Sequence, residues 1–174
     1  PAPIIGDLSS IAGATQLAAD LASRALYPSV LVNNAGVFCN QPTRSIDGIE
    51  LTMAINHFGH AALTLAMLAD PRNQLRRIVN VSSIAHNRGR IDLDDITLTK
   101  RRFDGYAMYA ASKLANVLFT VALAERLRGR VAVNALHPGV VSTKLLQEGF
   151  GMTGPDSVAD GAAWIDPRIA QKVL

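Results

Sequence analysis

The sequence of 174 residues is poor in cysteine, in aromatic residues and in long apolar runs. Its one cysteine, Cys39, excludes an internal disulfide. The longest apolar stretch, residues 61–69, is too short for a bilayer, which needs about 20 residues in a helix. We therefore expect no membrane span and a cytoplasmic location.

The chain also lacks a concentrated charge of either sign, since its formal net charge is only +3. The one basic cluster, residues 100–102, is flanked by Asp92, Asp94, Asp95 and Asp104. A solvated loop is the simplest interpretation of this cluster, and contact with phosphate or a membrane surface is the alternative. No aromatic residues are interleaved with the basic ones, so we expect no nucleic-acid partner.

A complete set of metal ligands is missing as well. His57 and His60 are three residues apart and His137 precedes a proline, but no carboxylate or thiol near them completes a ligand set. We expect no metal site. With 49% hydrophobic and 18% charged residues, the composition is that of a single α/β domain with a sizeable core.

Three β-branched runs punctuate the chain, and each ends in small or polar residues. The runs are residues 29–33, 77–82 and 131–136, and each predicts a buried strand followed by a turn. Helices are predicted for about 10–26, for about 47–69 with Asp47 as its cap, and for about 108–128. In an open α/β sheet, ligands bind at the carboxyl ends of the strands, where these polar residues lie.

Tyr109 and Lys113 are four residues apart, which places both side chains on one face of a helix. A phenol titrates near ~10, and an ammonium group about 4 Å away would favour its ionised form. A tyrosine with a lowered pKa can exchange a proton with an alcohol or a ketone. Taken alone, the pair could equally be an ordinary contact on a helix surface.

The motifs together resemble the short-chain dehydrogenase/reductase family, in the branch of retinol dehydrogenases and WW-domain oxidoreductases. The cues for this branch are Asn-His-Phe-Gly-His at 56–60, the long stretch 84–108, and the run 112–119. The resemblance covers about residues 6–158. It implies an α/β fold, a Rossmann-like doubly wound parallel sheet in three layers, seen here without its first strands.

The resemblance also implies roles for individual residues. Ser83 would bond the substrate oxygen, and Tyr109 would exchange a proton with it. Lys113 would lower the Tyr109 pKa and bind the nicotinamide ribose, while Asn56 would hold a water that links Lys113 to solvent. Asn33, Ala35 and Gly36 would support the ribose on the adenine side and the central sheet. The other residues implied to border the cofactor are Asp7, Leu8, Pro138, Gly139, Val141 and Thr143.

The implied function is an NAD(P)-dependent oxidoreductase that interconverts an alcohol and a carbonyl of a small lipophilic substrate. NADP is favoured slightly over NAD, although the residue that selects between them follows a strand with no counterpart in this sequence. The alternative is a catalytically silent NAD(P)-binding scaffold or sensor of the same fold. Helix 109–127 is apolar on more than one face, so we expect a homo-oligomer formed through it.

One departure from the family pattern concerns the two ends of the chain. The family begins with a strand and a glycine-rich turn that cradles the pyrophosphate, and no such turn occurs here. We expect residues 1–174 to belong to a single NAD(P)-binding domain whose first strands and helices precede them. Near Trp164 the family's last strand has no counterpart before a terminal helix expected over 166–174, so we expect a gap there.

Overall fold

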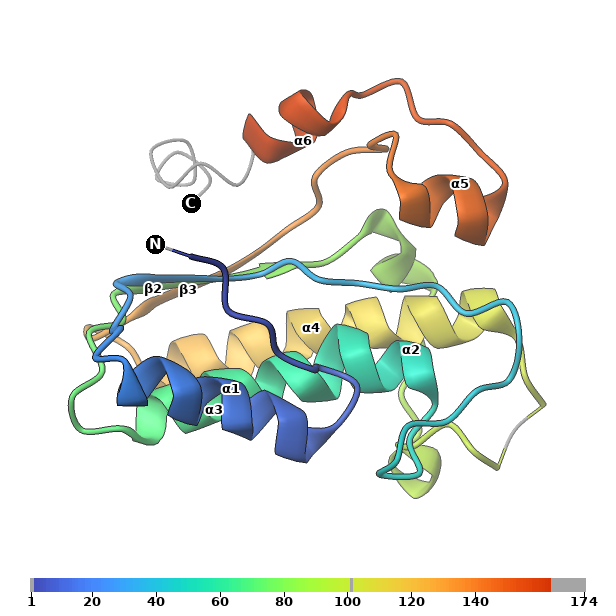
Figure 1. The fold of residues 1–174 in the computed structure, drawn as a ribbon. Coiled ribbons are helices and arrows are strands. Elements are labelled where there is room, and N and C mark those ends of the chain that lie inside the picture. The colour runs from blue at the N-terminus through green and yellow to red at the C-terminus, as the bar shows by residue number, and fades with distance from the viewer. Residues whose placement is uncertain (1, 101, 164–174) are drawn as a thin grey trace.

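The computed structural model describes residues 2–100 and 102–163. Three parallel strands form one sheet in the order β1-β2-β3 (Figure 1). They are β1 (Val30–Asn33), β2 (Arg77–Val81) and β3 (Ala132–Leu136). The three strands lie within a residue of the predicted ranges, and the parallel sheet with helical connections confirms the Rossmann-like α/β fold. The gap expected at Trp164 and the terminal helix lie outside the described residues.

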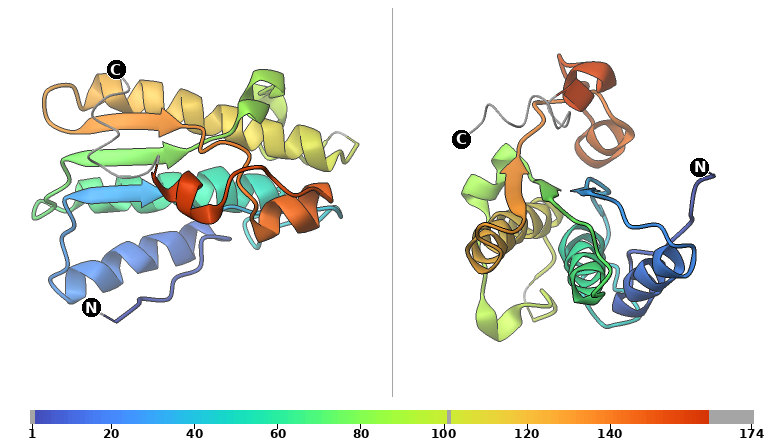
Figure 2. Two further views of the ribbon diagram at one scale, coloured as in Figure 1. Left: turned by 90° about the horizontal axis from the view of Figure 1, so that it is seen from above. Right: turned by 90° about the vertical axis from the view of Figure 1, so that its left-hand side faces the viewer.

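The three longest helices lie side by side against one face of the sheet (Figures 1 and 2). They are α1 (Ile11–Ser23), α3 (His60–Ala69) and α4 (Gly105–Arg126). The shorter elements are α2 (Leu51–Met53), the π-helix η1 (Ala54–Gly59), the 3-10 helices η2 (Ile84–Arg88) and η3 (Leu93–Asp95), α5 (Lys144–Phe150) and α6 (Val158–Ala163). In both figures α5 and α6 lie on the other side of the sheet from the long helices. Within the described residues, only these two short helices represent the second helical layer of a three-layer fold.

The main core lies between the sheet and the long helices. Leu31, Ile78 and Val133 are aligned across the three strands and face the helices. Ala14 and Ala18 of α1 pack in the same cluster, and their small side chains let this helix approach closely. Burial of these apolar groups is the main term that holds the helices to the sheet.

The start of the second predicted helix differs from expectation. Glu50, and not Asp47, caps it, because the buried Glu50 carboxylate accepts from the Thr52 and Met53 backbone N–H groups at 3.0 and 2.9 Å. Asp47 instead accepts from the Ile11 backbone N–H at 2.8 Å. A carboxylate serves either N-terminus equally well, so the pattern alone could not assign this one.

The π-helical turn η1 interrupts the helix that follows. An added Cβ on Gly59 in this turn would lie 2.2 Å from the Leu8 carbonyl oxygen. The backbone before α1 therefore crosses η1 at a distance that only glycine permits. Single π-turns of this kind occur frequently at functional sites.

Two helical segments, Leu51–Ala69 and Gly105–Arg126, are long and apolar enough to cross a membrane by length and composition alone. About half of each tested window is buried inside the structure, 50% and 56% respectively. The first segment is longer than its apolar run suggested because α2, η1 and α3 are continuous. Burial in the core accounts for much of the apolar character of both.

Candidate functional site

A cavity of about 390 Å³ opens at the carboxyl ends of the strands. It lies where the sheet topology predicts a ligand site. Its lining consists of Asn34, Ala35, Gly36, Val81, Ser82, Tyr109, Lys113, Pro138, Gly139, Val140, Val141, Thr143, Lys144, Leu145, Leu146 and Phe150. Eight of the predicted site residues are therefore brought together: Ala35, Gly36, Tyr109, Lys113, Pro138, Gly139, Val141 and Thr143.

Tyr109 and Lys113 both project from α4 into this cavity, and both are buried, at 7% and 4% exposure. The Lys113 Nζ lies 5.6 Å from the centroid of the Tyr109 ring. It donates a hydrogen bond to the Val81 carbonyl oxygen at the end of β2, at 3.0 Å. A surface pair would be exposed, so the alternative of an ordinary helix-surface contact is excluded.

The pKa of Tyr109 differs from the sequence-based prediction in its direction. Burial raises the pKa of the Tyr109 phenol, and the hydrogen bond with Ser83 lowers it by less. Burial also lowers the pKa of Lys113, to about 8. Desolvation disfavours the charged forms of both groups, so in this structure the effect of burial on the Tyr109 pKa outweighs the lowering expected from Lys113.

Ser83 is the N-cap residue of η2, two residues after the end of β2. Its side-chain oxygen accepts from the Ala85 backbone N–H at 3.2 Å and is the hydrogen-bonding partner of Tyr109. The preceding Ser82 was not singled out by sequence, yet its Oγ donates to the Lys113 carbonyl oxygen at 2.8 Å. The paired hydroxyls thus have different tasks, since Ser82 ties α4 to β2 and Ser83 faces Tyr109.

Asn56 lies behind the cavity wall, in η1, and is fully buried. Its side chain bonds both the N–H and the carbonyl oxygen of Val37, at 2.8 and 3.0 Å, and donates to Ser112 Oγ at 3.1 Å. An added Cβ on Gly36 would lie 3.5 Å from Asn56 Oδ1 and 3.7 Å from Lys113 Nζ. Asn56 is therefore adjacent to Lys113 across Gly36.

The Asn56 backbone carbonyl is a second polar centre. It accepts from Asn116 Nδ2 at 2.9 Å and lies 3.1 Å from His60 Nδ1, which must carry the proton to bond a carbonyl. Burial lowers the pKa of His60 to about 4, and the charges of Lys113 and His57 add to that shift. Neither Asn116 nor His60 was predicted as a site residue. His60 lies one helical turn after Asn56, whereas the approach of Asn116 to η1 is a contact over 60 residues that no local pattern indicates.

Asn33 does not reach the cavity. Its Nδ2 donates to Thr64 Oγ1 at 2.9 Å and to Asn80 Oδ1 at 2.8 Å, and Asn80 in turn donates to Thr120 Oγ1 at 2.8 Å. These bonds join β1 and β2 to α3 and α4 under the sheet. This agrees with the predicted support of the sheet and leaves no contact with the cavity.

Asp7 and Leu8 also lie outside the cavity lining. The exposed Asp7 accepts from the Ser9 backbone N–H at 2.8 Å, and this bond lowers the pKa of its carboxyl group. Leu8 packs against the main core. The structure does not bring either residue together with Tyr109.

The segment after β3 forms the far wall of the cavity. Gly139 has φ +87, and an added Cβ there would lie 2.5 Å from Asp156 Oδ2. The same carboxylate oxygen accepts from the Val140 backbone N–H at 3.1 Å. Thr143 caps α5 by accepting from the Leu146 backbone N–H at 3.3 Å. Asp156 thus holds this loop against itself, and α5 projects over the site.

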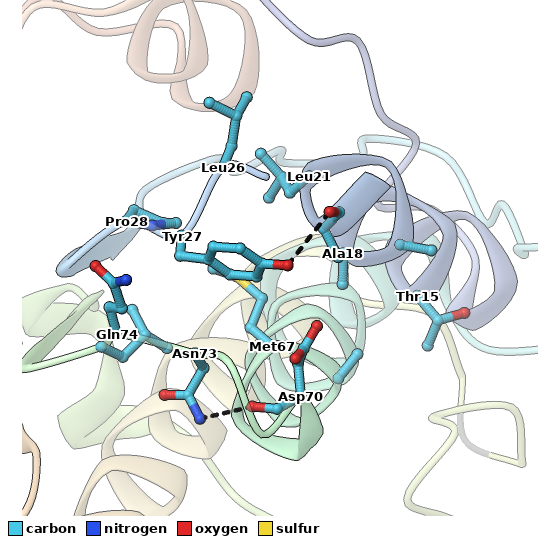
Figure 3. Close-up of a pocket in the computed structure, with 14 residues that line it drawn as sticks. Thr15, Ala18, Leu21, Leu26, Tyr27, Pro28, Met67, Asp70, Asn73 and Gln74 are labelled. Carbon is cyan, nitrogen blue, oxygen red and sulfur yellow. Dashed lines mark hydrogen bonds between the residues drawn. The ribbon is translucent and has the colours of Figure 1, made fainter. Parts of the chain in front are cut away.

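A second hollow, of about 200 Å³, lies between the ends of α1 and α3, away from Tyr109 (Figure 3). Its wall is formed mainly by alanine and leucine side chains together with Tyr27 and Met67. The Tyr27 hydroxyl donates to the Ala22 carbonyl oxygen at 3.3 Å. Asp70 at this hollow is paired with Arg72 at 2.8 Å, so no free acid or base faces the space.

Comparisons with known proteins agree with this arrangement. A family model described as short chain dehydrogenase matches residues 2–152. Retinol dehydrogenase 13 from Homo sapiens is 42% identical over 141 residues, which are 80% of this chain and 43% of that protein. Retinol dehydrogenase 12 from Homo sapiens is 45% identical over 120 residues, 68% of this chain and 38% of that protein. The chain thus spans less than half the length of these curated relatives.

Solved structures show the same likeness. An uncharacterised protein from Mycobacterium paratuberculosis superposes with a TM-score of 0.70 at 36% identity, over 82% of this chain and 52% of that one. A blue fluorescent protein from a metagenomic library, in complex with NADPH, gives a TM-score of 0.67 at 26% identity, over 97% of this chain and 69% of that one. By its sequence match, its parallel sheet and the placement of its motifs, this chain belongs to the short-chain dehydrogenase family.

Proposed function

We propose that the protein containing this chain is an NAD(P)-dependent oxidoreductase that interconverts an alcohol and a carbonyl. The observation that carries the proposal is the burial of Tyr109 and Lys113 side by side in the cavity at the carboxyl ends of the strands. Burying an ammonium group costs free energy, and here the nearby groups that stabilise it are few. Such a costly arrangement is expected where a charge is needed for binding or chemistry.

The cavity suits the nicotinamide end of a dinucleotide. Ala35, Gly36 and Gly139 offer backbone without bulk at its wall, and Lys113 offers a donor for ribose hydroxyls. We propose that Pro138, Val141 and Thr143 border the nicotinamide. When bound in its reduced form, the cofactor supplies the hydride that reduces a carbonyl carbon. We favour NADP slightly over NAD, and the complex of the blue fluorescent protein with NADPH supports a cofactor of this class.

The chain's own residues would handle the proton. A Tyr109 whose pKa is raised by burial is protonated at neutral pH, so it can donate to the substrate oxygen as a carbonyl is reduced. Ser83 is hydrogen-bonded to the Tyr109 hydroxyl. It would also hold the substrate oxygen in place and stabilise the negative charge that develops on that oxygen. Lys113 would stabilise the phenolate that remains, and Asn56 would place the water through which Lys113 reaches solvent.

The proposed substrate is a small lipophilic alcohol or carbonyl compound. The names of the retinol dehydrogenases, 42% and 45% identical, support this class. A catalytically silent scaffold or sensor of the same fold is the second candidate. It would need the cavity but not the pairing of Ser83, Tyr109 and Lys113, which is intact here.

We also propose a homo-oligomer formed through the predicted helix 109–127, which corresponds to α4, with the neighbouring α3 extending the contact surface. Leu65 on α3 and Leu118 and Val121 on α4 are 50%, 52% and 63% exposed, although all three are large and apolar. A second copy laid on these helices would remove this surface from water. Leu118→Glu together with Val121→Glu should convert a dimer to a monomer in size-exclusion chromatography with light scattering, and an unchanged mass would contradict the proposal.

For the location of the protein we propose the cytoplasm. The half-buried packing of the two apolar helices supports a core role for them rather than a membrane role. Cell fractionation of the tagged full-length protein tests this, and recovery only in detergent-extracted membranes would contradict it.

The activity itself is tested with the full-length natural protein. NADH and NADPH would be titrated by fluorescence, and aldehydes and ketones would be assayed by absorbance at 340 nm. We expect turnover that Tyr109→Phe lowers by about 10²–10⁴-fold while cofactor affinity persists. Cofactor binding without turnover, equal in wild type and variant, would favour the scaffold or sensor.

A further inference from the structure

Aromatic side chains are scarce in this chain but concentrated at one place. The sequence has five phenylalanines, three tyrosines and one tryptophan. Four of these nine side chains, Phe38, Tyr106, Tyr109 and Phe150, form a single cluster of ring contacts. They come from the loop after β1, from α4 and from α5, so only the tertiary structure joins them.

Phe150 is the centre of this cluster. Its ring centroid lies 4.4 Å from that of Phe38, 5.4 Å from Tyr109 and 6.2 Å from Tyr106. The planes of Phe150 and Tyr109 are nearly perpendicular, at 79°. The contacts of Phe150 with Tyr109 and Tyr106 have the separations and near-perpendicular ring planes that aromatic pairs prefer. Phe150 lines the cavity together with Tyr109, whereas Phe38 and Tyr106 do not. Phe38 and Tyr106 therefore support Phe150 from behind.

The position of Phe150 depends on the glycine before it. An added Cβ on Gly149 would lie 2.7 Å from Phe38 Cβ and 2.8 Å from Phe38 Cγ. These atoms are the rigid base of the side chain, so they cannot swing aside as the tip of a flexible chain could. Any larger residue at 149 must push the end of α5 away from Phe38 and carry Phe150 with it.

We propose that Phe150 is a specificity-determining residue of this site, and that Gly149 positions it by seating α5 on Phe38. The inference rests on the proposed function, because it concerns the substrate that Tyr109 would protonate. A carbonyl group that reaches Tyr109 brings its neighbouring atoms against the face or edge of the Phe150 ring. A flat unsaturated group of the substrate can form a stacked or edge-to-face contact with the Phe150 ring, and a puckered saturated group of equal size cannot.

The test compares two substrates of matched size, benzaldehyde and cyclohexanecarbaldehyde, in the full-length protein. We expect wild type to favour benzaldehyde in kcat/KM. Phe150→Ala should lower that preference by about tenfold, chiefly through KM for benzaldehyde. Phe150→Tyr, which keeps the ring, should restore it. Gly149→Ala should shift the preference in the same direction as Phe150→Ala.

Gln147→Ala is the matched control, because Gln147 is an exposed residue of the same helix. It should leave both kcat/KM values unchanged, and NADPH affinity should be equal in all variants. An unchanged preference in Phe150→Ala with intact NADPH binding would overturn the inference and leave the proposed function standing.

A wild type without turnover on either aldehyde would count against the proposed function alone. The inference is then measured by calorimetric binding of the two aldehydes in the Tyr109→Phe background. Tighter binding of benzaldehyde that Phe150→Ala abolishes would support it, and equal binding of both aldehydes before and after that change would overturn it.

Discussion

Two of the hollows in the described part of the chain differ in chemistry far more than in shape. The hollow at the carboxyl ends of the strands is lined by the buried Tyr109 and Lys113 and by glycine and alanine residues that expose their backbone. The one at the amino ends, between α1 and α3, is walled by alanine and leucine, and its tyrosine hydroxyl is bonded to a backbone carbonyl. Both are concave and largely apolar. What separates them is the presence of ionisable groups held under desolvation, which cost stability and enable chemistry.

Removing one phenolic hydroxyl from each hollow should have the largest and most unequal effect. Tyr109→Phe should lower turnover by about 10²–10⁴-fold, because it removes the proton donor. Tyr27→Phe should leave kcat/KM unchanged, because it removes only the 3.3 Å bond to Ala22. Both variants would be assayed with the same aldehyde and the same cofactor. Equal losses in the two variants would show that the hollows do not differ as argued.

Low pH should destabilise the fold through His60, which lies behind the hollow that contains Tyr109. The folded-state pKa of His60 is lowered from 6.5 to about 4. The contribution of neutral His60 to the free energy of unfolding is therefore fully present above about pH 6.5 and is lost as the pH falls through about 4. Between these pH values the unfolded chain binds the proton and the folded chain does not. The loss should reach about 3 kcal/mol, at about 1.4 kcal/mol for each pKa unit.

Urea unfolding between pH 7 and pH 4 measures this loss. His60→Gln can still donate to the Asn56 carbonyl oxygen but does not titrate, so its stability should fall less steeply over the same range. Parallel pH profiles for variant and wild type would contradict the assignment to His60.

The smallest effect is expected at the second hollow. Met67 is buried and lines that hollow. Its replacement by alanine should lower the free energy of unfolding by about 2–3 kcal/mol. The figure lies at the low end for methionine because neighbouring side chains can move into the space. Met67→Ala should leave kcat per folded molecule unchanged, as measured by active-site titration with the cofactor. A selective fall in kcat would show that this hollow is coupled to Tyr109.

The positions of the strands and helices were predictable from the sequence, whereas the helix cap and the π-helical turn were not. The predicted strands agree with the observed ones because β-branched runs bounded by turns are a strong local signal. The helix predicted to begin at Asp47 does end at Ala69, but the predicted cap residue was wrong and the π-helical turn was not predicted. Both features depend on contacts with distant segments, those of Asp47 with Ile11 and of Gly59 with Leu8.

The candidate site shows the same division. Phe150 was not named among the predicted site residues, because no local pattern indicates which side chain of the segment after Thr143 turns inward. The spacing to Lys113 predicted a lowered Tyr109 pKa, whereas burial raises it. The spacing is a local property of the sequence, and the depth of burial is not.

The sequence alone located the three buried strands and the helices between them, because periodicities of two and 3.6 residues are local signals. The parallel sheet and the grouping of Ser83, Tyr109 and Lys113 at its carboxyl end followed from the resemblance to the short-chain dehydrogenase/reductase family, whose motifs the sequence carries. Tertiary structure alone decided how deeply Tyr109 and Lys113 are buried, that Asn33 serves the sheet and not the cavity, and that Phe150 meets Tyr109. These depend on which segments far apart in the chain pack together, and desolvation and ring contacts exist only once they do.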